Sequence, residues 1–385
     1  ILKDFVVRSQ GMLGKDAPYV PGWDCHGLPI EWKVEEQYRK KKLDKDQVPA
    51  KEFRAECRAY AQHWVDVQRE QLKRLGIGGD WDNPYLTMQF DSEATIVAEL
   101  LKCAESGQLY RGAKPVRWSP VEKTALAEAE VEYEDIVSTQ VDVAFTILEA
   151  PNAPDGVWDS EVVIWTTTPW TIPINQAIAY NPTIDYAVYL VGNGEEMRSV
   201  IVAESLFEEF KRRTGWFNED PAEQPRWRLK PEHFVGMTAR HPMHHLGGFF
   251  AEPRPMLPGV FVTTDSGTGL VHMAPDHGED DFELCRHYGL LPQFVVEADG
   301  RYRDNWPWLP RTDERSMSVI NPKFNAPDGP VCADLREVGA LLAASTDYQH
   351  SYPHSWRSKA KVIFRCTPQW FVPMDRPIEA LAPDD

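Results

Sequence analysis

The polar residues best suited to chemistry gather in one stretch, VHMAPDHGEDDF, at residues 271–282. It places His272 and His277 close to three consecutive acidic residues, Glu279, Asp280 and Asp281, and it contains a proline and a glycine, which turn the backbone. Imidazole and carboxylate groups at such short spacing are typical of a binding or catalytic site. We therefore predict that this stretch forms the floor of a site.

A second stretch, VVIWTTTPWT at residues 162–171, is the expected partner of the first. Its apolar start predicts a strand that ends in three adjacent threonines, Thr166, Thr167 and Thr168. Pro169 prevents this strand from continuing undisturbed. The threonine hydroxyls at the strand end would be available to a substrate.

Three interpretations of the acidic stretch follow from residue types alone. His277, Asp280 and Asp281 could ligate a metal ion, since imidazole and carboxylate are both common ligands. The acidic residues could also cap a helix that runs through FELCRHYG, because negative charge is favoured at a helix amino end. In the third interpretation, one carboxylate binds a cationic substrate group while threonine hydroxyls and backbone amides bind the rest.

The flanking sequence indicates which elements would position these residues. GVFVTTDSGTGLVH predicts two strands joined by a glycine-containing turn, a hairpin that brings His272 to a strand end. Short β-branched runs dominate residues 156–334, with one helix, ESLFEEFKRRTG, that ends at Gly215. DLREVGALLAAS then predicts a short helix, and KVIFRCTPQWFVPMD a further strand. This part of the chain should form a β-rich, barrel-like domain.

The amino-terminal part is predicted to be helical. Apolar residues recur at three- and four-residue spacing over residues 51–75, which is typical of an amphipathic helix. Another helix is expected to begin with Asp91 or Ser92 as its N-cap and to end at Gly107.

A loop rich in proline and glycine, PYVPGWDCHGLPIE, precedes those two helices. Loops at strand ends of α/β domains commonly bind small molecules. Asp24 could receive an ammonium group, and Trp23 could form a wall against an apolar side chain. The alternative is a structural loop, in which Trp23 packs in a core and Asp24 caps the helix that begins near Leu28.

Length and composition restrict the class of protein. At 385 residues, with 42% hydrophobic and 26% charged residues, the chain suits a soluble globular protein of two or three domains. It has no apolar run of membrane-spanning length and no signal sequence, and its six cysteines form no CxxC pair. A cytoplasmic protein without disulfides is expected. Because Ile1 lies inside an expected helix, we also expect a fragment.

The formal charge of −18 argues against a protein that binds nucleic acid with its whole surface, although local contacts stay open. Basic clusters occur at residues 39–42, 211–213, 226–230 and 357–361. Such clusters are usually solvated faces.

Several segments together resemble those of isoleucyl-tRNA synthetases. PGWDCHGLPIE is similar, almost letter for letter, to the amino-acid-binding segment of that family, and the valyl and leucyl relatives carry different residues after GWD. The other matching segments follow in order: LGIGGDWDNPYLTM, TALAEAEVEYED, IWTTTPWTIPINQAIAYNP, GTGLVHMAPDHGEDDF and CTPQWFVPMD. The resemblance therefore covers the whole chain.

This resemblance implies an α/β fold, with a partial Rossmann-type catalytic domain of a class I aminoacyl-tRNA synthetase and an inserted, β-rich editing domain. On this basis, residues 1–138 are expected to hold part of the catalytic domain and the start of the connective insertion. Residues 139–348 would form the editing domain, and residues 349–385 would return to the catalytic domain.

The resemblance also implies a function, namely ATP-dependent attachment of isoleucine to its tRNA with hydrolytic editing of valine attached by mistake. The two amino acids differ by one methylene, worth roughly 0.8 kcal/mol of burial. Isoleucyl-tRNA synthetase is the standard illustration of why binding alone rejects valine poorly. A second pocket that is too small for isoleucine adds the missing discrimination, because steric overlap rejects the larger side chain.

The resemblance assigns roles to residues in the two stretches at 162–171 and 271–282. Asp281 would bind the α-ammonium group of valine esterified to the 3′-terminal adenosine of tRNA, since a buried cation needs a paired carboxylate. Thr166, Thr167 and Thr168 would offer hydroxyls to the adenosine, the ester and the attacking water, and Thr168 and His272 would narrow the pocket. Because positioned water and a polarised carbonyl suffice for an activated ester, no histidine is assigned as a base.

Two neighbouring positions complete this picture. Asn175 is a further candidate for holding the nucleotide at the editing site. Met273 stands where relatives often carry threonine, which leaves open whether the lining beside His272 is polar or apolar.

For the synthetic site, the resemblance assigns the binding of isoleucine to one loop and to Trp370, for which core packing is the alternative. The loop residues are Pro21, Gly22, Trp23, Asp24 and His26. The family's HIGH and KMSKS sequences, which act on ATP with Mg²⁺, do not occur in this chain. We therefore expect no isoleucine-dependent exchange between ATP and pyrophosphate, and robust exchange would contradict this.

Many relatives bind zinc through two CxxC pairs. This sequence carries Ser119, Glu122, Ser355 and Ser358 at those positions, so no structural zinc is expected. The resemblance further implies isoleucine-specific tRNA as the partner, isoleucine, valine and ATP as small-molecule ligands, a monomer, and no membrane.

Two other functions remain as alternatives. A free-standing hydrolase of mischarged tRNA would share the pocket but would not need PGWDCHGLPIE or TPQWF. A metal-dependent hydrolase would use His272, His277, Asp280 and Asp281, and metal analysis of the purified protein would distinguish it.

Overall fold

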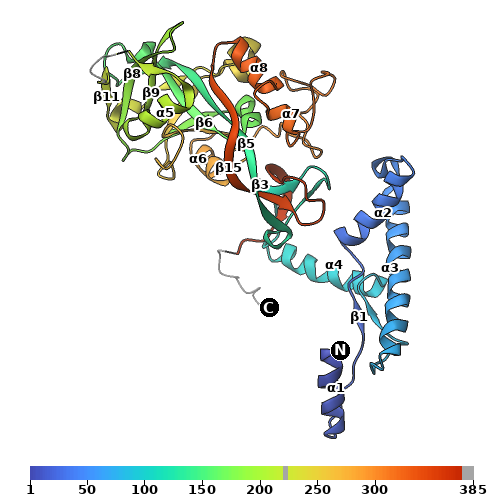
Figure 1. The fold of residues 1–385 in the computed structure, drawn as a ribbon. Helices are drawn as coiled ribbons and strands as arrows, with labels where there is room; N and C mark the ends of the chain where they lie inside the picture. The colour runs from blue at the N-terminus through green and yellow to red at the C-terminus, as the bar shows by residue number, and fades with distance from the viewer. Residues whose placement is uncertain (220–223, 375–385) are drawn as a thin grey trace. The chain divides into compact units, whose positions relative to one another are not determined.

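The computed structural model describes residues 1–219 and 224–374. The chain is α/β and divides into two compact units (Figure 1). The first unit comprises Ile1–Arg111 and Trp370–Asp385, and the second comprises Gly112–Gln369. No helix in the described part of the chain combines the length and the apolar character needed to cross a membrane.

The described residues of the first unit contain four α-helices and one short parallel strand pair. The helices are α1 (Leu2–Met12), α2 (Leu28–Lys40), α3 (Ala50–Arg74) and α4 (Phe90–Glu105), and β1 (Gly22–Trp23) pairs with β2 (Tyr85–Leu86). α3 confirms the amphipathic helix predicted over residues 51–75. The predicted cap of α4 is wrong, because the N-cap is Gln89, and Asp91 and Ser92 lie in the first turn.

The core of the first unit is small. Its cluster of buried apolar residues consists of Cys25, Ala61, Val65, Leu86 and Met88. α3 buries only the alanine and valine of this cluster, and neither α1 nor α4 buries any residue. The first unit thus has well-formed helices but little apolar surface removed from water.

The second unit is built on a large mixed sheet of eleven strands. Its strands are β5 (Val131–Glu149), β6 (Glu161–Thr166), β7 (Ala177–Tyr180), β8 (Tyr186–Gly192), β9 (Met197–Ala203), β10 (Phe217–Asn218), β11 (Trp227–Leu229), β12 (Thr238–Ala239), β13 (Arg254–Pro258), β14 (Leu270–Met273) and β15 (Leu341–Ser355). The order is β10-β8-β9-β6-β5-β12-β13-β7-β14, with β11 on β8 and β15 on β5. The pairs β6–β9 and β13–β7 are parallel.

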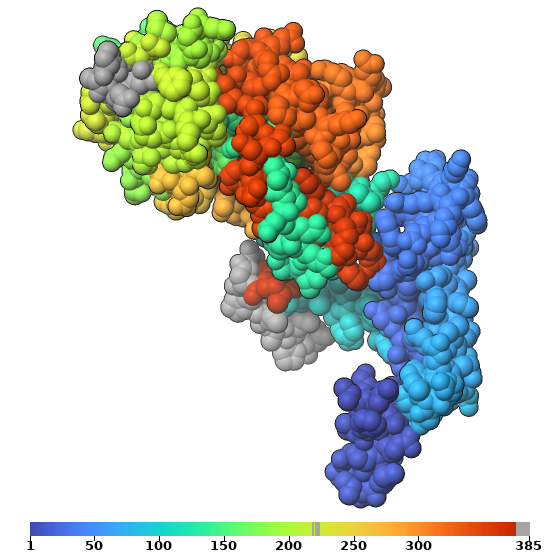
Figure 2. All heavy atoms as spheres, in the orientation of Figure 1, coloured from blue at the N-terminus to red at the C-terminus, as the bar shows by residue number. Residues whose placement is uncertain are grey.

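Helices cover this sheet at several places. They are α5 (Phe207–Thr214), α6 (Glu279–His287), α7 (Pro322–Asn325) and α8 (Pro330–Glu337). A three-stranded sheet is also present, in which β3 (Tyr110–Ser119) lies between β16 (Ile363–Phe371) and β4 (Thr124–Ala125). Figures 1 and 2 show that β8, β9 and α5 lie on one side of β15, while α7 and α8 lie on the other.

Most of the strands and helices predicted for this unit are confirmed. The helix in ESLFEEFKRRTG ends before Gly215, which has a positive φ of 74°. β6 ends at Thr166, as the threonine–proline sequence predicts, and β16 corresponds to the predicted strand in KVIFRCTPQWF.

The hairpin predicted from GVFVTTDSGTGLVH is wrong. Its first half forms turns, because the side-chain amide of Asn181 donates to the carbonyl oxygens of Val260 and Val262 at 3.2 and 2.8 Å and so occupies acceptors that a sheet would use. Its second half is β14, which pairs antiparallel with β7 instead. His272 still lies on a strand, one residue before its end.

The helix predicted in DLREVGALLAAS is only half correct. α8 ends at Glu337, and Gly339 adopts a positive φ of 71°, which stops the helix. The apolar residues that follow begin β15, which pairs with β5 over nearly its whole length. Pairing with a distant strand therefore overrides the local helical pattern.

Candidate functional site

The three predicted threonines leave β6 in a tight turn. Thr166 is the last residue of the strand and is buried. Its hydroxyl lies 3.0 Å from the hydroxyl of Thr168 and accepts a hydrogen bond of 3.1 Å from the Thr168 backbone N–H. Pro169 then begins a 3₁₀ helix, Pro169–Ile174. The turn therefore presents Thr167 and Thr168 side by side at the strand end.

His272 is linked to this turn through Thr171, a residue that the sequence analysis missed. The Thr171 hydroxyl donates to the Thr168 carbonyl oxygen at 2.8 Å and lies 2.9 Å from His272 Nε2. Because a hydroxyl carries only one hydrogen, we infer that His272 Nε2 donates the second bond. The spacing of Thr168 and Thr171, one helical turn apart, is the only local signal for this contact.

Burial keeps His272 neutral near pH 7. Burial first, and the neighbouring His277 second, lower the pKa of His272 to about 4. With hydrogen on Nε2, its Nδ1 atom is a buried acceptor, and Nδ1 has no hydrogen-bond partner among the described residues. His272 is thus equipped to accept a hydrogen bond rather than to carry charge.

Asp281 lies in the first turn of α6, which confirms the predicted acidic helix start. Its Oδ2 accepts a hydrogen bond of 2.7 Å from the backbone N–H of Ala274, two residues after His272. A Cβ atom at Gly278 would lie 2.7 Å from Asp281 Oδ1, so glycine leaves the space that the carboxylate occupies. Burial raises the pKa of the half-buried Asp281 to about 7. A cationic group bound nearby would offset the free-energy cost of burying the ionised carboxylate.

The other residues of the acidic stretch serve the local fold. Asp276 is buried and accepts backbone hydrogen bonds from Gln293 and Phe294 at 2.8 and 2.6 Å. His277 donates from Nδ1 to the Phe364 carbonyl oxygen at 2.7 Å. These bonds tie the stretch to the chain on either side of it.

The metal interpretation finds no support in this geometry. Asp280 is exposed, and His272 and His277 each use one ring nitrogen in a hydrogen bond. Within the described residues, no group of three or more His, Cys, Asp or Glu side chains is arranged to hold a metal ion.

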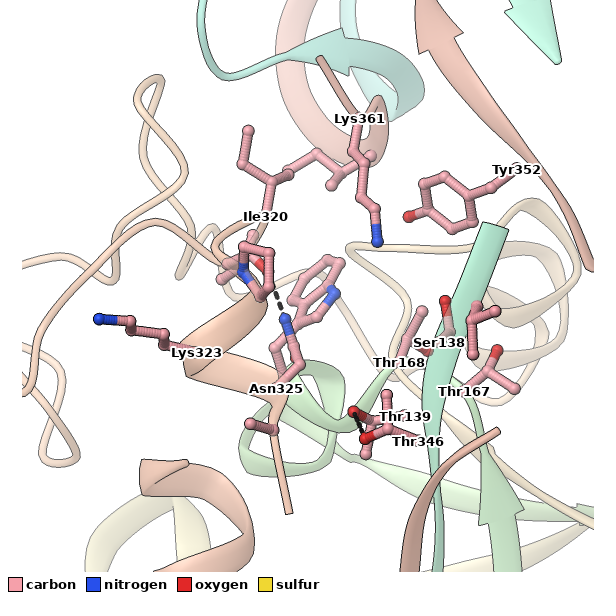
Figure 3. Close-up of a pocket in the computed structure, with 16 residues that line it drawn as sticks. Ser138, Thr139, Thr167, Thr168, Ile320, Lys323, Asn325, Thr346, Tyr352 and Lys361 are labelled. Carbon is pink, nitrogen blue, oxygen red and sulfur yellow. Dashed lines mark hydrogen bonds between the residues drawn. The ribbon is translucent and has the colours of Figure 1, made fainter. Parts of the chain in front are cut away.

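A pocket of about 280 Å³ opens beside the threonine turn (Figure 3). Thr167 and Thr168 line it, while Thr166 lies behind Thr168, and His272 and Asp281 are not among the lining residues. The remaining walls come from β5, β15, the 3₁₀ helix Pro169–Ile174, α7 with the residues on either side of it, and residues 361–363: Val137, Ser138, Thr139, Trp170, Val319, Ile320, Pro322, Lys323, Asn325, Ala326, Thr346, Tyr352, Lys361 and Ile363. None of these described lining residues is acidic.

Asn175 and Met273 both lie in the interior. Asn175 is fully buried and donates from its amide to the Ala177 carbonyl oxygen at 2.7 Å, while its Oδ1 has no partner among the described residues. Met273 is also fully buried and packs in an apolar cluster with Ala177 and Cys285. The polarity of residue 273 therefore does not affect the pocket lining.

The loop predicted to bind an amino acid lies in the first unit. Gly22 and Trp23 form β1, and the Trp23 indole donates to Gln68 at 2.8 Å. Asp24 does not cap α2, whose N-cap is Gly27. Instead, Asp24 accepts a bond of 3.2 Å from the backbone N–H of His26. The predicted helix cap at Asp24 is therefore wrong, whereas Trp23 packs against the apolar cluster of the first unit, as the structural alternative expects.

The remaining residues predicted for this site are dispersed over the first unit. Pro21 is buried, and its carbonyl oxygen accepts from the backbone N–H of Tyr85 at 2.8 Å. His26 lines a pocket of about 310 Å³ between α2 and α3. Trp370, near the end of β16, is 68% exposed, so core packing does not account for it.

The four positions at which relatives carry zinc ligands come together as a hydrogen-bonded cluster. Glu122 accepts bonds from the Ser355 hydroxyl at 2.7 Å and from the Ser358 backbone N–H at 3.1 Å, and the Ser119 hydroxyl accepts from the Glu122 backbone N–H at 3.2 Å. Ser119 and Ser355 are fully buried. One carboxylate and three serines do not match the thiolate and imidazole ligands of structural zinc sites.

Comparison with known proteins gives three findings. The family model described as "tRNA synthetases class I (I, L, M and V)" matches residues 1–383. The isoleucine–tRNA ligase of Zymomonas mobilis is 60% identical over 380 residues, which are 98% of this chain and 39% of that protein. The isoleucine–tRNA ligase of Gluconobacter oxydans is 49% identical over 392 residues, covering 97% of this chain and 39% of that protein. The chain thus spans about two fifths of the length of these relatives.

A solved structure, the editing domain of the P. falciparum cytosolic leucyl-tRNA synthetase, is 14% identical with a TM-score of 0.32, covering 40% of this chain and 67% of that one. A likeness at this level carries no argument about function.

Proposed function

Because the chain belongs to the class I tRNA synthetases of the isoleucine, leucine, methionine and valine group, we propose that it is part of an isoleucine–tRNA ligase. The whole protein would attach isoleucine to its tRNA at the expense of ATP. The second unit would hydrolyse valine that has been attached to this tRNA by mistake.

One observation carries the hydrolytic proposal, namely the hydrogen-bonded link between the threonine turn and His272. Thr168, Thr171 and His272 form a continuous chain of hydrogen bonds, and Asp281 is bonded to the backbone of Ala274 close by. A hydroxyl-rich turn, a neutral acceptor and a carboxylate lacking a cation are therefore held in one region of the unit.

These groups suit the hydrolysis of an activated ester. The Thr167 hydroxyl has no hydrogen-bond partner among the described residues and faces the pocket, so it is free to bind the ester or the attacking water (Figure 3). The ionised carboxylate of Asp281 would bind the α-ammonium group of valine, and this pairing would offset the cost of burying the carboxylate. Thr166 and Thr168 would position the adenosine and the water, which requires no strong base.

Discrimination against isoleucine would be steric. Thr168 and His272 would narrow the space for the substrate side chain, so that the additional methylene of isoleucine overlaps with the wall. Asn175, whose amide oxygen lacks a partner among the described residues, would contribute to holding the nucleotide.

The finer organisation of the fold is also part of this proposal. Residues 1–138 would hold part of a Rossmann-type catalytic domain and the start of the insertion, residues 139–348 a barrel-like editing domain, and residues 349–385 the return segment. Isoleucine would bind to a set of residues in the first unit, with aromatic walls from both ends of the chain: Pro21, Gly22, Trp23, Asp24, His26 and Trp370.

The parent enzyme would use ATP with Mg²⁺ to activate the carboxyl group of isoleucine. No set of three or more metal-binding side chains assembles in the described part of the chain. We further propose that the cluster around Glu122 holds no zinc, and that the whole protein is a cytoplasmic monomer that binds isoleucine-specific tRNA.

Hydrolysis of valine-charged and isoleucine-charged isoleucine tRNA by the whole 385-residue chain tests the proposal. We expect cleavage of the valine ester only, and at least about tenfold slower cleavage by Asp281→Ala because the ammonium loses its partner. The matched control is Asp280→Ala, which removes an adjacent but exposed carboxylate and should keep the activity. A folded chain that cleaves neither ester would contradict the proposal.

A further inference from the structure

Two lysines line the threonine pocket, and the proposed hydrolysis uses neither charge. Lys323 is exposed and points away from the pocket, whereas Lys361 points into it (Figure 3). Lys361 belongs to the basic cluster at residues 357–361, which the sequence alone would assign to a solvated face. In the structure it is half-buried, and its ammonium group points into the pocket (Figure 3). An isolated β-bridge to His354 and a bond of 3.0 Å from the Val362 N–H to the Pro353 carbonyl oxygen fix its backbone.

The ammonium group of Lys361 has no carboxylate partner in the described part of the chain. The pocket lining contains no acidic residue, and Lys361 Nζ lies over the Tyr352 ring, 5.3 Å from its centroid. Burial correspondingly lowers the pKa of Lys361. A half-buried cation without a counterion in a chain of net charge −18 is an arrangement that favours an anionic ligand.

The Tyr352 hydroxyl, which also lines the pocket, has no hydrogen-bond partner among the described residues. It lies beside the ammonium group of Lys361 in Figure 3. Several neighbouring polar groups are engaged: Thr139 is bonded to Thr346 at 3.2 Å, and Asn325 donates to the Val319 carbonyl oxygen at 2.7 Å. Lys361 and Tyr352 therefore offer one cation and one hydroxyl to a ligand.

We propose that Lys361, with the hydroxyl of Tyr352, binds a phosphodiester group of the RNA strand whose 3′-terminal ester is cleaved at the threonine turn. This inference rests on the proposed function, because it identifies the substrate's partner in the same site. An aminoacylated RNA end carries a positive ammonium group at its tip and negative phosphodiesters behind it. Lys361 would repel the ammonium group and attract a phosphodiester, so the two charges need separate partners.

The positions of the charged residues meet this requirement. Asp281 is not part of the pocket lining, while Thr167 and Thr168 line the pocket and connect through Thr171 to His272. The turn therefore lies between a cationic pocket and the segment that carries Asp281. The tip of the strand would point toward Asp281, with its backbone beside Lys361.

The pocket walls favour a nucleic-acid strand over a free phosphate ion. Trp170 and Tyr352 both line the pocket, and aromatic side chains stack on bases or riboses of single-stranded RNA. An isolated phosphate ion would make no use of these rings.

Binding of an RNA minihelix with the acceptor end of the tRNA to the whole chain tests the role of Lys361. We expect about tenfold weaker binding for Lys361→Ala, since a hydrogen bond to a charged group is lost, and recovery of most of the affinity for Lys361→Arg. The slope of log K against log salt should fall by about 0.7, the value for one phosphate of a single strand. The matched control is Lys323→Ala, which removes an equal charge from an exposed side chain that points away from the pocket and should leave affinity unchanged (Figure 3).

A minihelix with one neutral methylphosphonate linkage near its 3′ end tests the phosphodiester directly. At one position this linkage should weaken binding to the parent chain about tenfold and should cause no further loss with Lys361→Ala. The inference would be overturned if the minihelix bound equally tightly wherever the methylphosphonate linkage is placed. Full affinity of a folded Lys361→Ala chain for the unmodified minihelix would also overturn it. Equally tight, Lys361-dependent binding of AMP would overturn the assignment to the RNA strand.

Kinetics separate this inference from the proposed function. With the valine-charged tRNA, Lys361→Ala should raise KM about tenfold and leave kcat nearly unchanged, because the contact lies outside the reacting bond. Hydrolysis by the parent chain that is indifferent to Lys361 would overturn the inference alone. Lys361-dependent RNA binding without hydrolysis would overturn the proposed function and support the inference.

Discussion

The two units differ in how much apolar surface each buries, although both contain well-formed helices or strands. In the first unit, α4 exposes Phe90 at 77% and Leu101 at 55%, and the cluster of buried apolar residues in its described part contains five residues. In the second, strands such as β6 bury apolar residues on both faces, and Val162, Val163 and Ile164 are all fully buried. Burial of apolar surface is the main source of stability, so the second unit should be the stable one.

This difference also bears on the two predicted sites. The threonine pocket is built from β5, β15, α7 and the turn that follows β6 in the second unit, and hydrogen bonds through Thr171 fix this turn to His272. The loop around Trp23 rests on a strand pair of two residues each. A site needs a rigid support to hold groups in position, and only the threonine pocket has a large core behind it.

Among the changes predicted here, removal of a buried charge from the second unit should lower the free energy of unfolding most. Asp142 and Arg213, with side chains 1% and 8% exposed, are joined by two hydrogen bonds of 2.8 and 2.7 Å. Asp142→Ala should lower the free energy of unfolding by about 3 kcal/mol, because Arg213 loses its buried partner. Urea denaturation would measure this.

The matched control in the first unit is Glu35→Ala. Its partner Arg39 has a side chain that is 47% exposed, so the loss should be below about 0.5 kcal/mol. Equal losses for the two variants would contradict the contrast between the units.

Removal of the Glu122 carboxylate from its hydrogen-bonded cluster should cause an intermediate loss of stability. Glu122→Ala would leave the buried Ser355 hydroxyl and the Ser358 N–H without their acceptor, so we expect a loss of about 2 kcal/mol. Glu128→Ala, which removes an ion pair from a 72% exposed side chain, is the control and should cost less than about 1 kcal/mol. A chelator should leave the parent chain's stability unchanged, and a fall on its addition would show that a metal contributes.

The smallest expected change in stability is the one that depends on the proton of Asp281 and therefore on pH. The folded state holds the proton of Asp281 up to about pH 7, whereas the unfolded chain loses it near the ordinary value of 3.8. Stability from this proton is therefore complete below pH 4 and is lost as the pH rises through 7. Asp281→Asn should gain stability relative to the parent between pH 5 and 8, by about 1 kcal/mol after allowance for solvent.

Thermal unfolding across this pH range measures the difference. Asp24→Asn in the first unit, which changes an exposed carboxyl group, is the control and should follow the parent chain at every pH. An Asp281→Asn chain that also follows the parent would show that burial of this carboxyl group carries no cost.

Local patterns in the sequence predicted many of the elements that carry the site. The spacing over residues 51–75 predicts α3, the threonines and Pro169 predict the end of β6, and the acidic residues predict the start of α6. Each of these depends on residues close together in the chain. Local chemistry was sufficient where the element's own hydrogen bonds or caps decide its limits.

Long-range contacts account for the parts that could not be predicted. Thr171 and His272 are 101 positions apart, and no pattern near either residue indicates their hydrogen bond. The Asn181 amide that prevents the predicted hairpin is also 79 positions from Val260. Lys361 has the sequence surroundings of a solvated lysine, and only the packing of β15 and α7 around it makes a pocket.

The most direct test of the account is hydrolysis by residues 112–369 alone, beside the whole chain. If the second unit folds by itself and contains the complete editing site, it should cleave valine-charged isoleucine tRNA within about threefold of the rate of the whole chain and leave the isoleucine ester intact. A folded second unit that cleaves neither ester, while the whole chain still cleaves the valine ester, would contradict a self-contained site.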